Sequence, residues 1–253
     1  MPRLGPTDDS QMEQLRIGGK GFSFSGTKIA HLGATEYTLV TIAVDETGSV
    51  ADFATDLRTM LVAAVSACKK SPRSDNILIR VITFASRYPQ GVKEIHGFKP
   101  LAEIDTAKYP DIKPGGNTPL CDACYSAIGA TNAYGASLIA QDFGVNGILF
   151  VITDGEENCS TASVAMVKAE SEKARQQETL ESLVSVLVGV NAAGCRSSLT
   201  AFKQSAGMTQ YVDVGDATPR RLAKLAEFVS TSVSSQSQSI GSGGASQNIA
   251  ATI

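Results

Sequence analysis

Short apolar runs alternate with amphipathic segments along most of this chain, a pattern typical of strands that alternate with helices. The sequence predicts strands at YTLVTIAV (37–44), NILIRVITFA (76–85), GILFVIT (147–153) and SLVSVLVGV (182–190), with weaker ones at VKEIHGF (92–98) and QYVDV (210–214). Strands that are apolar on both faces belong to a parallel sheet covered by helices on both sides. We therefore predict an α/β fold, Rossmann-like and doubly wound, with about six mostly parallel strands, one of them an antiparallel edge strand.

The helices between these strands are predicted from helical spacing and from capping residues. The first helix places one apolar stripe toward the core, formed by Val50, Phe53, Leu57, Leu61, Ala64 and Cys68. Further helices are expected to begin near Thr118, Ser163 and Ser197. The last begins at Thr218-Pro219, because Thr is a good cap and Pro suits a first turn. It is expected to bury Leu222, Leu225, Phe228 and Val229.

The two ends of the chain differ from this regular middle. Residues 1–36 are polar and glycine-rich with no sustained period, so we expect an N-terminal extension that wraps around the domain or stays loose. The segment after residue 235 is rich in Ser, Gln and Gly and predicts a flexible tail over 236–253. Between these two ends we predict one domain, over residues 37–235.

Composition excludes several classes of function. The net charge of −3 and the pI near 5.5 give no basic footprint for nucleic acid. No stretch approaches the length of about 20 apolar residues that a membrane span needs. The N-terminus lacks the order of a secretory signal, and five cysteines, an odd count, suit a reducing compartment. We expect a cytoplasmic protein that binds neither nucleic acid nor membrane. The CxxC pair Cys121 and Cys124 lacks a second pair at zinc spacing.

Two of the strongest strands run directly into an aspartate, Asp45 and Asp154. In an open parallel sheet, ligands bind beyond the carboxyl ends of the strands, at the point where strand order reverses. Thr47 and Ser49 alternate with Asp45 and can present their oxygens on the same side, and the glycine loop KPGGNTPL brings Thr118 to a helix start. Carboxylates with neutral hydroxyls form an all-oxygen set, which suits Mg²⁺, Mn²⁺ or Ca²⁺.

These segments resemble the metal-ion-dependent adhesion site of the von Willebrand factor A (vWA) domain. That site is written Asp-x-Ser-x-Ser, then a distant Thr and a distant Asp; here it reads DETGS at 45–49, Thr118 in GGNTPL and Asp154 in TDGEEN. Thr47 departs from the usual serine but keeps the hydroxyl. The resemblance covers residues 37–235 and implies Asp45, Thr47, Ser49, Thr118 and Asp154 as metal ligands, with Mg²⁺ as the expected ion.

The resemblance also implies a function without catalysis. In this family an acidic side chain of a partner protein fills the open position on the ion, so we expect an interaction module that acts as adaptor or scaffold. Intracellular relatives work beside AAA+ ATPases and other multi-subunit assemblies, and the short layout favours a stand-alone bacterial or phage-type member. Three further acids, Glu46, Glu156 and Glu157, crowd the site. We expect them to be solvated rather than ligating.

An enzymatic alternative remains open. A Mg²⁺-dependent phosphotransferase of haloacid-dehalogenase type also uses a nucleophilic aspartate after its first strand, here Asp45. The second acid of that motif would stand at position 47, which is Thr. A serine hydrolase is disfavoured, because neither His31 nor His96 stands in a catalytic context.

Overall fold

Eight strands form one sheet in the order β1-β2-β5-β4-β3-β6-β7-β8 in the computed structural model, which describes residues 11–18, 21–176 and 180–242. The strands are β1 (Met12–Ile17), β2 (Phe22–Thr27), β3 (Glu36–Asp45), β4 (Ile77–Phe84), β5 (Val92–Pro100), β6 (Gly144–Thr153), β7 (Ser182–Val190) and β8 (Gln210–Gly215). The predicted α/β class and all six predicted strands are confirmed.

The central strands are parallel, and β3 lies at the point where strand order reverses. The chain begins this part of the sheet at β3, builds β4 and β5 on one side, and then crosses to β6, β7 and β8 on the other. β3 pairs with β4 and β6 along nearly its whole length, with Val44 opposite both Thr83 and Ile152. The carboxyl ends of β3 and β6 therefore lie side by side at the switch point, where ligands bind in folds of this kind.

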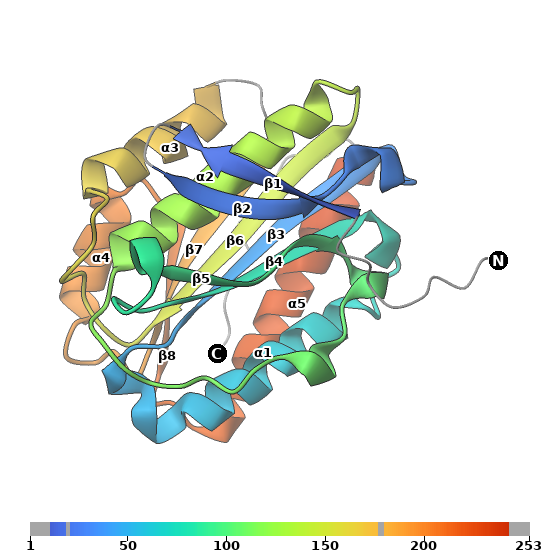
Figure 1. The fold of residues 1–253 in the computed structure, drawn as a ribbon. Helices are drawn as coiled ribbons and strands as arrows, with labels where there is room; N and C mark the ends of the chain where they lie inside the picture. The colour runs from blue at the N-terminus through green and yellow to red at the C-terminus, as the bar shows by residue number, and fades with distance from the viewer. Residues whose placement is uncertain (1–10, 19–20, 177–179, 243–253) are drawn as a thin grey trace.

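Helices cover both faces of the sheet (Figure 1). They are the 3₁₀ turn η4 (Gly48–Phe53), α1 (Ala54–Cys68), α2 (Leu120–Ile139), α3 (Val164–Gln176), α4 (Arg196–Ser205) and α5 (Pro219–Ser242). α1 and α5 pack on one face, over a core that includes Val40, Ile42 and Phe150. α2, α3 and α4 lie on the other face, over Leu39, Leu149 and Leu187. The apolar stripes predicted for the first and last helices are buried as expected.

The N-terminal part of the chain adds two strands that the sequence pattern did not predict. β1 and β2 form an antiparallel hairpin, and β2 joins β5 through a single parallel pair, Gly26 and Phe98. The antiparallel strand β5 is consequently an inner strand, not the edge strand we predicted. Ile17, Phe22 and Phe24 are buried in the same core as α2, so this segment is held by apolar packing.

Small residues on α2 allow the hairpin to approach closely. A Cβ atom at Gly129 would lie 2.2 Å from Cγ2 of Ile17, closer than carbon atoms can pack. Nearly all of α2 is buried between the sheet, the hairpin and α3. A helix that is buried on all sides shows no single apolar stripe, so its sequence reads as weakly amphipathic.

The last helix continues to Ser242, beyond residue 235 where we expected a tail to begin. Gln236 and Ser237 are fully buried, and the Asn146 side chain donates a hydrogen bond to the Gln236 carbonyl at 2.7 Å. The rest of the predicted tail, 243–253, lies outside the described residues. The division into an extension, one domain and a tail stays a prediction.

Candidate metal centre

A chain of hydrogen bonds joins four of the predicted ligands across the ends of β3 and β6. The Thr47 amide donates to Asp45 Oδ1 at 2.8 Å. The hydroxyls of Thr47 and Ser49 lie 3.0 Å apart, and the Ser49 hydroxyl donates to Asp154 Oδ1 at 2.7 Å. A carboxylate therefore stands at each end of this chain, with two hydroxyls between them.

Local backbone structure explains why these side chains converge. Asp45 is the last residue of β3, and Thr47 is the cap of the 3₁₀ turn η4. The chain bends sharply here, so Ser49 turns toward the loop that follows β6, which carries Asp154. We predicted the same grouping of Asp45, Thr47 and Ser49 from the alternation of side chains in an extended loop. The observed backbone is instead a turn.

Thr118 lies across from this chain, against the residue that follows Asp154. A Cβ atom at Gly155 would lie 3.1 Å from the Thr118 hydroxyl oxygen, so a larger residue here would crowd that oxygen. The Thr118 amide donates to Asn158 Oδ1 at 2.9 Å, and the Asn158 amide donates to the Thr118 carbonyl at 3.2 Å. Within the described residues the Thr118 hydroxyl makes no hydrogen bond, and it is therefore free to coordinate an ion.

Asp45 is fully buried, and both of its carboxylate oxygens accept hydrogen bonds. Thr153 donates its hydroxyl proton to Asp45 Oδ2 at 2.7 Å. Burial raises the pKa of Asp45 to about 6, and hydrogen bonds from Thr47 and Thr153 lower it only in part. Burial likewise raises the pKa of Asp154. Two carboxylates that share a poorly solvated edge favour a cation between them.

The donor set fits a hard divalent cation. Among the described residues, no three His, Cys, Asp or Glu side chains form a metal cluster, so any ion here would take hydroxyl oxygens beside two carboxylates. Such an all-oxygen set matches Mg²⁺, Mn²⁺ or Ca²⁺. Thr153 and Asn158 are site residues that we did not predict. Thr153 precedes Asp154 and could have been inferred from that position, whereas the role of Asn158 depends on the path of its loop.

The acids around the site were expected to be solvated, and only Glu156 is exposed. Glu46 is buried; its carboxylate pairs with Arg87 at 2.8 Å and accepts the Lys113 amide at 2.9 Å. Glu157 accepts hydrogen bonds from the amides of Cys121, Cys159 and Ser160 and from the Ser160 hydroxyl. Burial opposes ionisation of Glu157, but these hydrogen bonds prevail and lower its pKa. Glu46 therefore supports the loops instead of facing solvent, and the half-buried Glu157 holds its own loop and the start of α2 through these hydrogen bonds.

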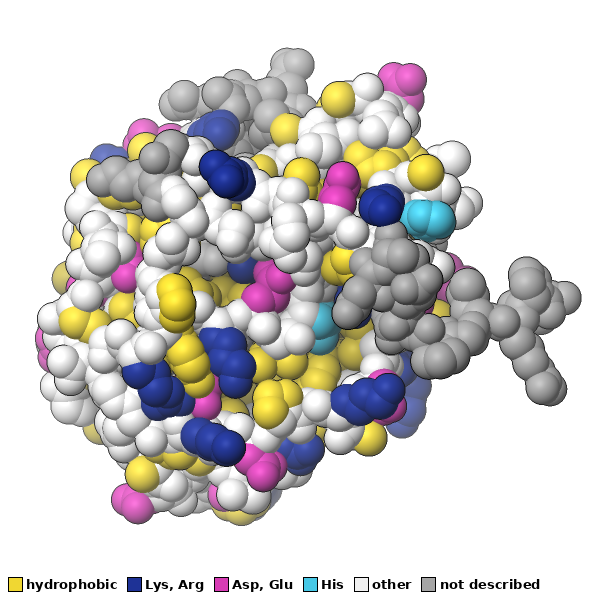
Figure 2. Space-filling model, viewed as in Figure 1, with side chains coloured by type: hydrophobic (Ala, Val, Ile, Leu, Met, Phe, Trp, Pro, Cys, Tyr) yellow, Lys and Arg dark blue, Asp and Glu magenta, His cyan; other side chains and the backbone are white. Residues whose placement is uncertain are grey.

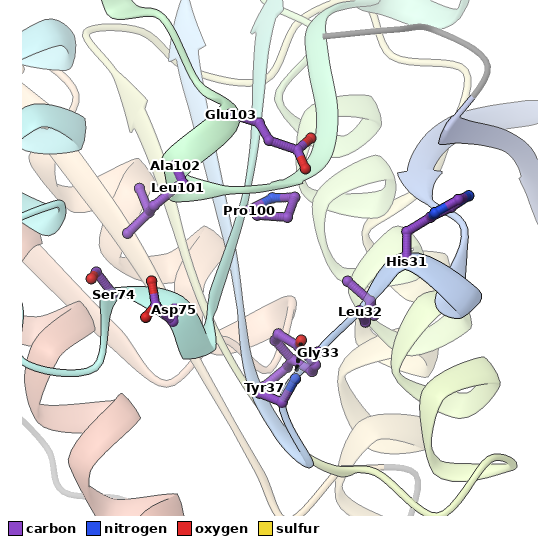
Figure 3. A pocket seen from close by; sticks show the side chains of 11 residues that line it. His31, Leu32, Gly33, Tyr37, Ser74, Asp75, Pro100, Leu101, Ala102 and Glu103 are labelled. Atoms are coloured by element: carbon purple, nitrogen blue, oxygen red, sulfur yellow. Dashed lines mark hydrogen bonds between the residues drawn. The ribbon is translucent and has the colours of Figure 1, made fainter. Parts of the chain in front are cut away.

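The two histidines lie away from this edge. His96 bonds to the Gly97 carbonyl and to the Tyr109 hydroxyl, and burial lowers its pKa to about 4. His31 borders a hollow of about 360 Å³ at the opposite edge of the sheet, together with Tyr37, Asp75 and Glu103 (Figure 3). Within the described part of the chain, His31, Asp75 and Glu103 form no hydrogen bond or ion pair with one another. Among the residues that the structure describes, neither histidine has the hydrogen-bonded partners of a hydrolase triad.

Solved structures of several adhesion and matrix proteins share this fold. A mutant of the PilB minor pilin from Streptococcus sanguinis is 13% identical, with 91% of this chain and 68% of that chain covered and a TM-score of 0.57. The vWF domain of the type V pili tip protein Mfa5 from Porphyromonas gingivalis is 10% identical, with 86% and 99% covered and a TM-score of 0.51. The chain therefore has a vWA-like fold.

A third similar structure carries a metal in its adhesion motif. Proximal thread matrix protein 1 from the mussel byssus, described with a zinc-occupied MIDAS motif, is 18% identical, with 80% of this chain covered and a TM-score of 0.51. Our chain spans 47% of that structure, less than half of its length. No protein-family model and no curated protein matches the sequence. The likeness establishes the fold.

Proposed function

We propose that this protein is a divalent-cation-dependent protein-binding module. The observation that carries the proposal is the hydrogen-bonded chain from Asp45 through Thr47 and Ser49 to Asp154. Beside it lies the Thr118 hydroxyl, which makes no hydrogen bond to any described residue. These five residues would hold Mg²⁺, with Mn²⁺ or Ca²⁺ as substitutes. The zinc in the mussel protein belongs to that structure; the all-oxygen set of this chain favours a harder ion.

Charge explains what such an ion would bind. The three hydroxyls are neutral, so an ion held by them and by the two aspartates keeps an open position that prefers an anionic oxygen. A Glu or Asp side chain of a partner protein supplies that oxygen. The protein would then act as an adaptor or scaffold in a larger assembly such as an AAA+ ATPase complex.

A binding role agrees better with the geometry than the phosphotransferase alternative. A nucleophilic aspartate needs an oxygen that can reach the substrate. Asp45 is fully buried, and its two oxygens accept hydrogen bonds from Thr47 and Thr153. Thr47 occupies the position where that enzyme class carries its second acid. We therefore propose a protein without catalytic activity.

The cellular location stays a prediction. The cysteines led us to expect the cytoplasm, whereas structures of similar fold include a minor pilin and a pilus tip protein. No helix in the described part of the chain is long and apolar enough to cross a membrane.

Affinity capture of partners from the native source tests the proposal. We expect a partner to be retained in Mg²⁺ by the wild type and by Thr118→Ser, which keeps the hydroxyl. The partner should be lost in chelator and with Thr118→Ala. Equal capture under all four conditions would contradict a metal-dependent module. Mg²⁺-dependent turnover of a generic aryl phosphate that is lost in Asp45→Asn would favour the phosphotransferase.

A further inference from the structure

Three basic side chains border the candidate metal centre on the side of the turn between β4 and β5. Arg87 lies in that turn, Lys93 follows it in β5, and Lys113 lies in the loop that leads into α2. Lys93 and Lys113 are exposed, and about a third of the Arg87 side chain is exposed. We call these three residues the basic rim. Figure 2 shows Lys and Arg side chains gathered in the lower left of the face drawn, where Figure 1 places the loop into α2.

The basic rim lies next to the predicted metal ligands. The Ser86 amide donates to the Asn117 carbonyl at 3.0 Å, and the Asn117 amide donates to the Ser86 hydroxyl at 2.9 Å. On the other side of the same loop, the Gly48 amide donates to the Gly116 carbonyl at 3.0 Å. Gly48 stands between the predicted ligands Thr47 and Ser49. One loop segment, residues 115–117, therefore separates the rim from the ligands.

Tyr88 holds two of the cations in place. The Arg87 guanidinium lies over the Tyr88 ring at 4.7 Å from its centroid, and the Lys93 ammonium lies at 5.5 Å. Arg87 also donates to the Tyr88 hydroxyl at 2.9 Å. Contacts of a cation with an aromatic face stabilise the cation where water is partly excluded. Two positive charges are thus concentrated at one position on the surface.

The charges around the centre leave the rim with excess positive charge. Glu46 neutralises Arg87, but neither Lys93 nor Lys113 forms an ion pair within the described residues. A divalent ion would be balanced by Asp45 and Asp154. Of the nearby acids, Glu157 is bound by backbone amides, and exposed Glu156 lies in the loop after β6. On the side of the basic rim, an approaching anion therefore meets two lysines that form no ion pair within the described residues, whereas the charges of Glu156 and Glu157 lie on the loop after β6.

We propose that the basic rim selects an acidic segment of the partner, in which carboxylates that flank the metal-bound one contact Lys93 and Lys113. This inference rests on the proposed function and adds the chemistry of the partner to it. A protein segment is favoured over a polyphosphate or a nucleic acid, because the rim is small and the chain as a whole carries a net charge of −3. Complementary charges at such a rim raise the association rate and the selectivity for acidic partners.

Two synthetic peptides test the inference by fluorescence anisotropy in Mg²⁺. Both have one central aspartate, which is flanked by serine and glycine in one peptide and by two glutamates on each side in the other. We expect the wild type to bind the glutamate-flanked peptide about tenfold more tightly at low ionic strength. In Lys93→Glu/Lys113→Glu this preference should disappear. Lys70→Glu is the matched control, because Lys70 is exposed and follows the end of α1 at the opposite edge of the sheet.

The possible outcomes separate the inference from the proposed function. Equal, Mg²⁺-dependent affinity for both peptides overturns the inference alone, as does a preference that survives the double substitution. Binding that is as strong in chelator as in Mg²⁺ overturns the proposed function. In that case the preference for the glutamate-flanked peptide, compared between the wild type and the double substitution, still tests the basic rim. Tighter binding of a short inorganic polyphosphate overturns the assignment to an acidic protein segment. The double substitution keeps the main-chain amide of residue 113, which donates to Glu46. A thermal melt checks that the variants fold.

Discussion

The Arg87 guanidinium pairs with the buried Glu46 carboxylate at 2.8 Å, directly beside the predicted metal ligands. Arg87 also donates to the carbonyls of Lys113 and Gly115. The pair therefore joins the end of β3, the turn after β4 and the loop before α2. These three segments are far apart in the sequence, so the pair fixes how the candidate centre is assembled.

Breaking this pair should destabilise the protein. Arg87→Ala leaves the Glu46 charge buried without its cation, which we expect to cost about 2 kcal/mol of unfolding free energy, less than for a fully buried pair because Arg87 is partly exposed. Removing both charges, with Arg87→Ala and Glu46→Gln, should cost less than the sum of the two single changes. Urea unfolding measures all three variants.

A surface pair serves as the control for this cycle. Arg221 pairs with Asp216 at 3.3 Å, and the Asp216 side chain is mostly exposed. Arg221→Ala should change the unfolding free energy by no more than about 0.5 kcal/mol. If the changes in unfolding free energy caused by Arg87→Ala and Glu46→Gln are fully additive in the double variant, the pair does not couple the loops.

Mg²⁺ should stabilise the folded protein through the Thr118 hydroxyl. An ion that binds only the folded state at about 100 times its dissociation constant adds about 2.7 kcal/mol. Thr118→Ala removes one oxygen ligand and should weaken Mg²⁺ binding at least about tenfold, as seen when metal sites lose a supporting group. Thr118→Ser keeps the hydroxyl and should retain most of the affinity. Thermal melts with and without Mg²⁺ measure the difference. A wild-type melting temperature that does not respond to Mg²⁺, Mn²⁺ or Ca²⁺ would contradict the site.

Acid should destabilise the protein through His96. Its Nδ1 donates to the Gly97 carbonyl, so its Nε2 accepts from the Tyr109 hydroxyl, and the ring is held neutral. Its pKa is about 4 in the folded protein against an ordinary value of 6.5, so below pH 6.5 the unfolded chain binds the proton first. Stability is therefore complete above pH 6.5 and declines as the pH falls toward 4, by about 3 kcal/mol.

The variant His96→Gln isolates this contribution. It cannot be protonated in this range, so its unfolding free energy should fall less than that of the wild type between pH 7 and pH 4. Urea unfolding at a series of pH values makes the comparison. Parallel curves for the two proteins would mean that other groups cause the acid sensitivity.

The close contact between Ile17 and Gly129 makes a prediction about the N-terminal hairpin. Gly129→Ala gains helix propensity of about 1 kcal/mol but places a Cβ against Ile17, and such overpacking costs about 1–3 kcal/mol. We expect net destabilisation in the wild type. In an Ile17→Ala background the clash is absent, so the same change should stabilise. An equal effect of Gly129→Ala in both backgrounds, measured by urea unfolding, would show that the hairpin does not pack on α2 as described.

Local patterns in the sequence determined the α/β class, the six strands from β3 to β8 and the starts of the helices. Each depends on side chains a few residues apart: apolar runs give strands, and Thr218 before Pro219 begins α5, where its hydroxyl accepts from the Arg221 amide at 3.3 Å. The spacing of Asp45, Thr47 and Ser49 directly after a strand likewise belongs to one short segment.

Only the tertiary structure decided which distant groups meet. The hairpin of β1 and β2 has no strong pattern of its own and is held because α2 offers small residues and β5 an open edge. From the sequence, Glu46 is expected to be solvated, whereas in the structure it pairs with Arg87. Ser49 donates a hydrogen bond to Asp154, which lies 105 positions away in the chain. Such contacts depend on how strands are ordered in the sheet, and strand order is set by packing of the whole core, which no local pattern contains.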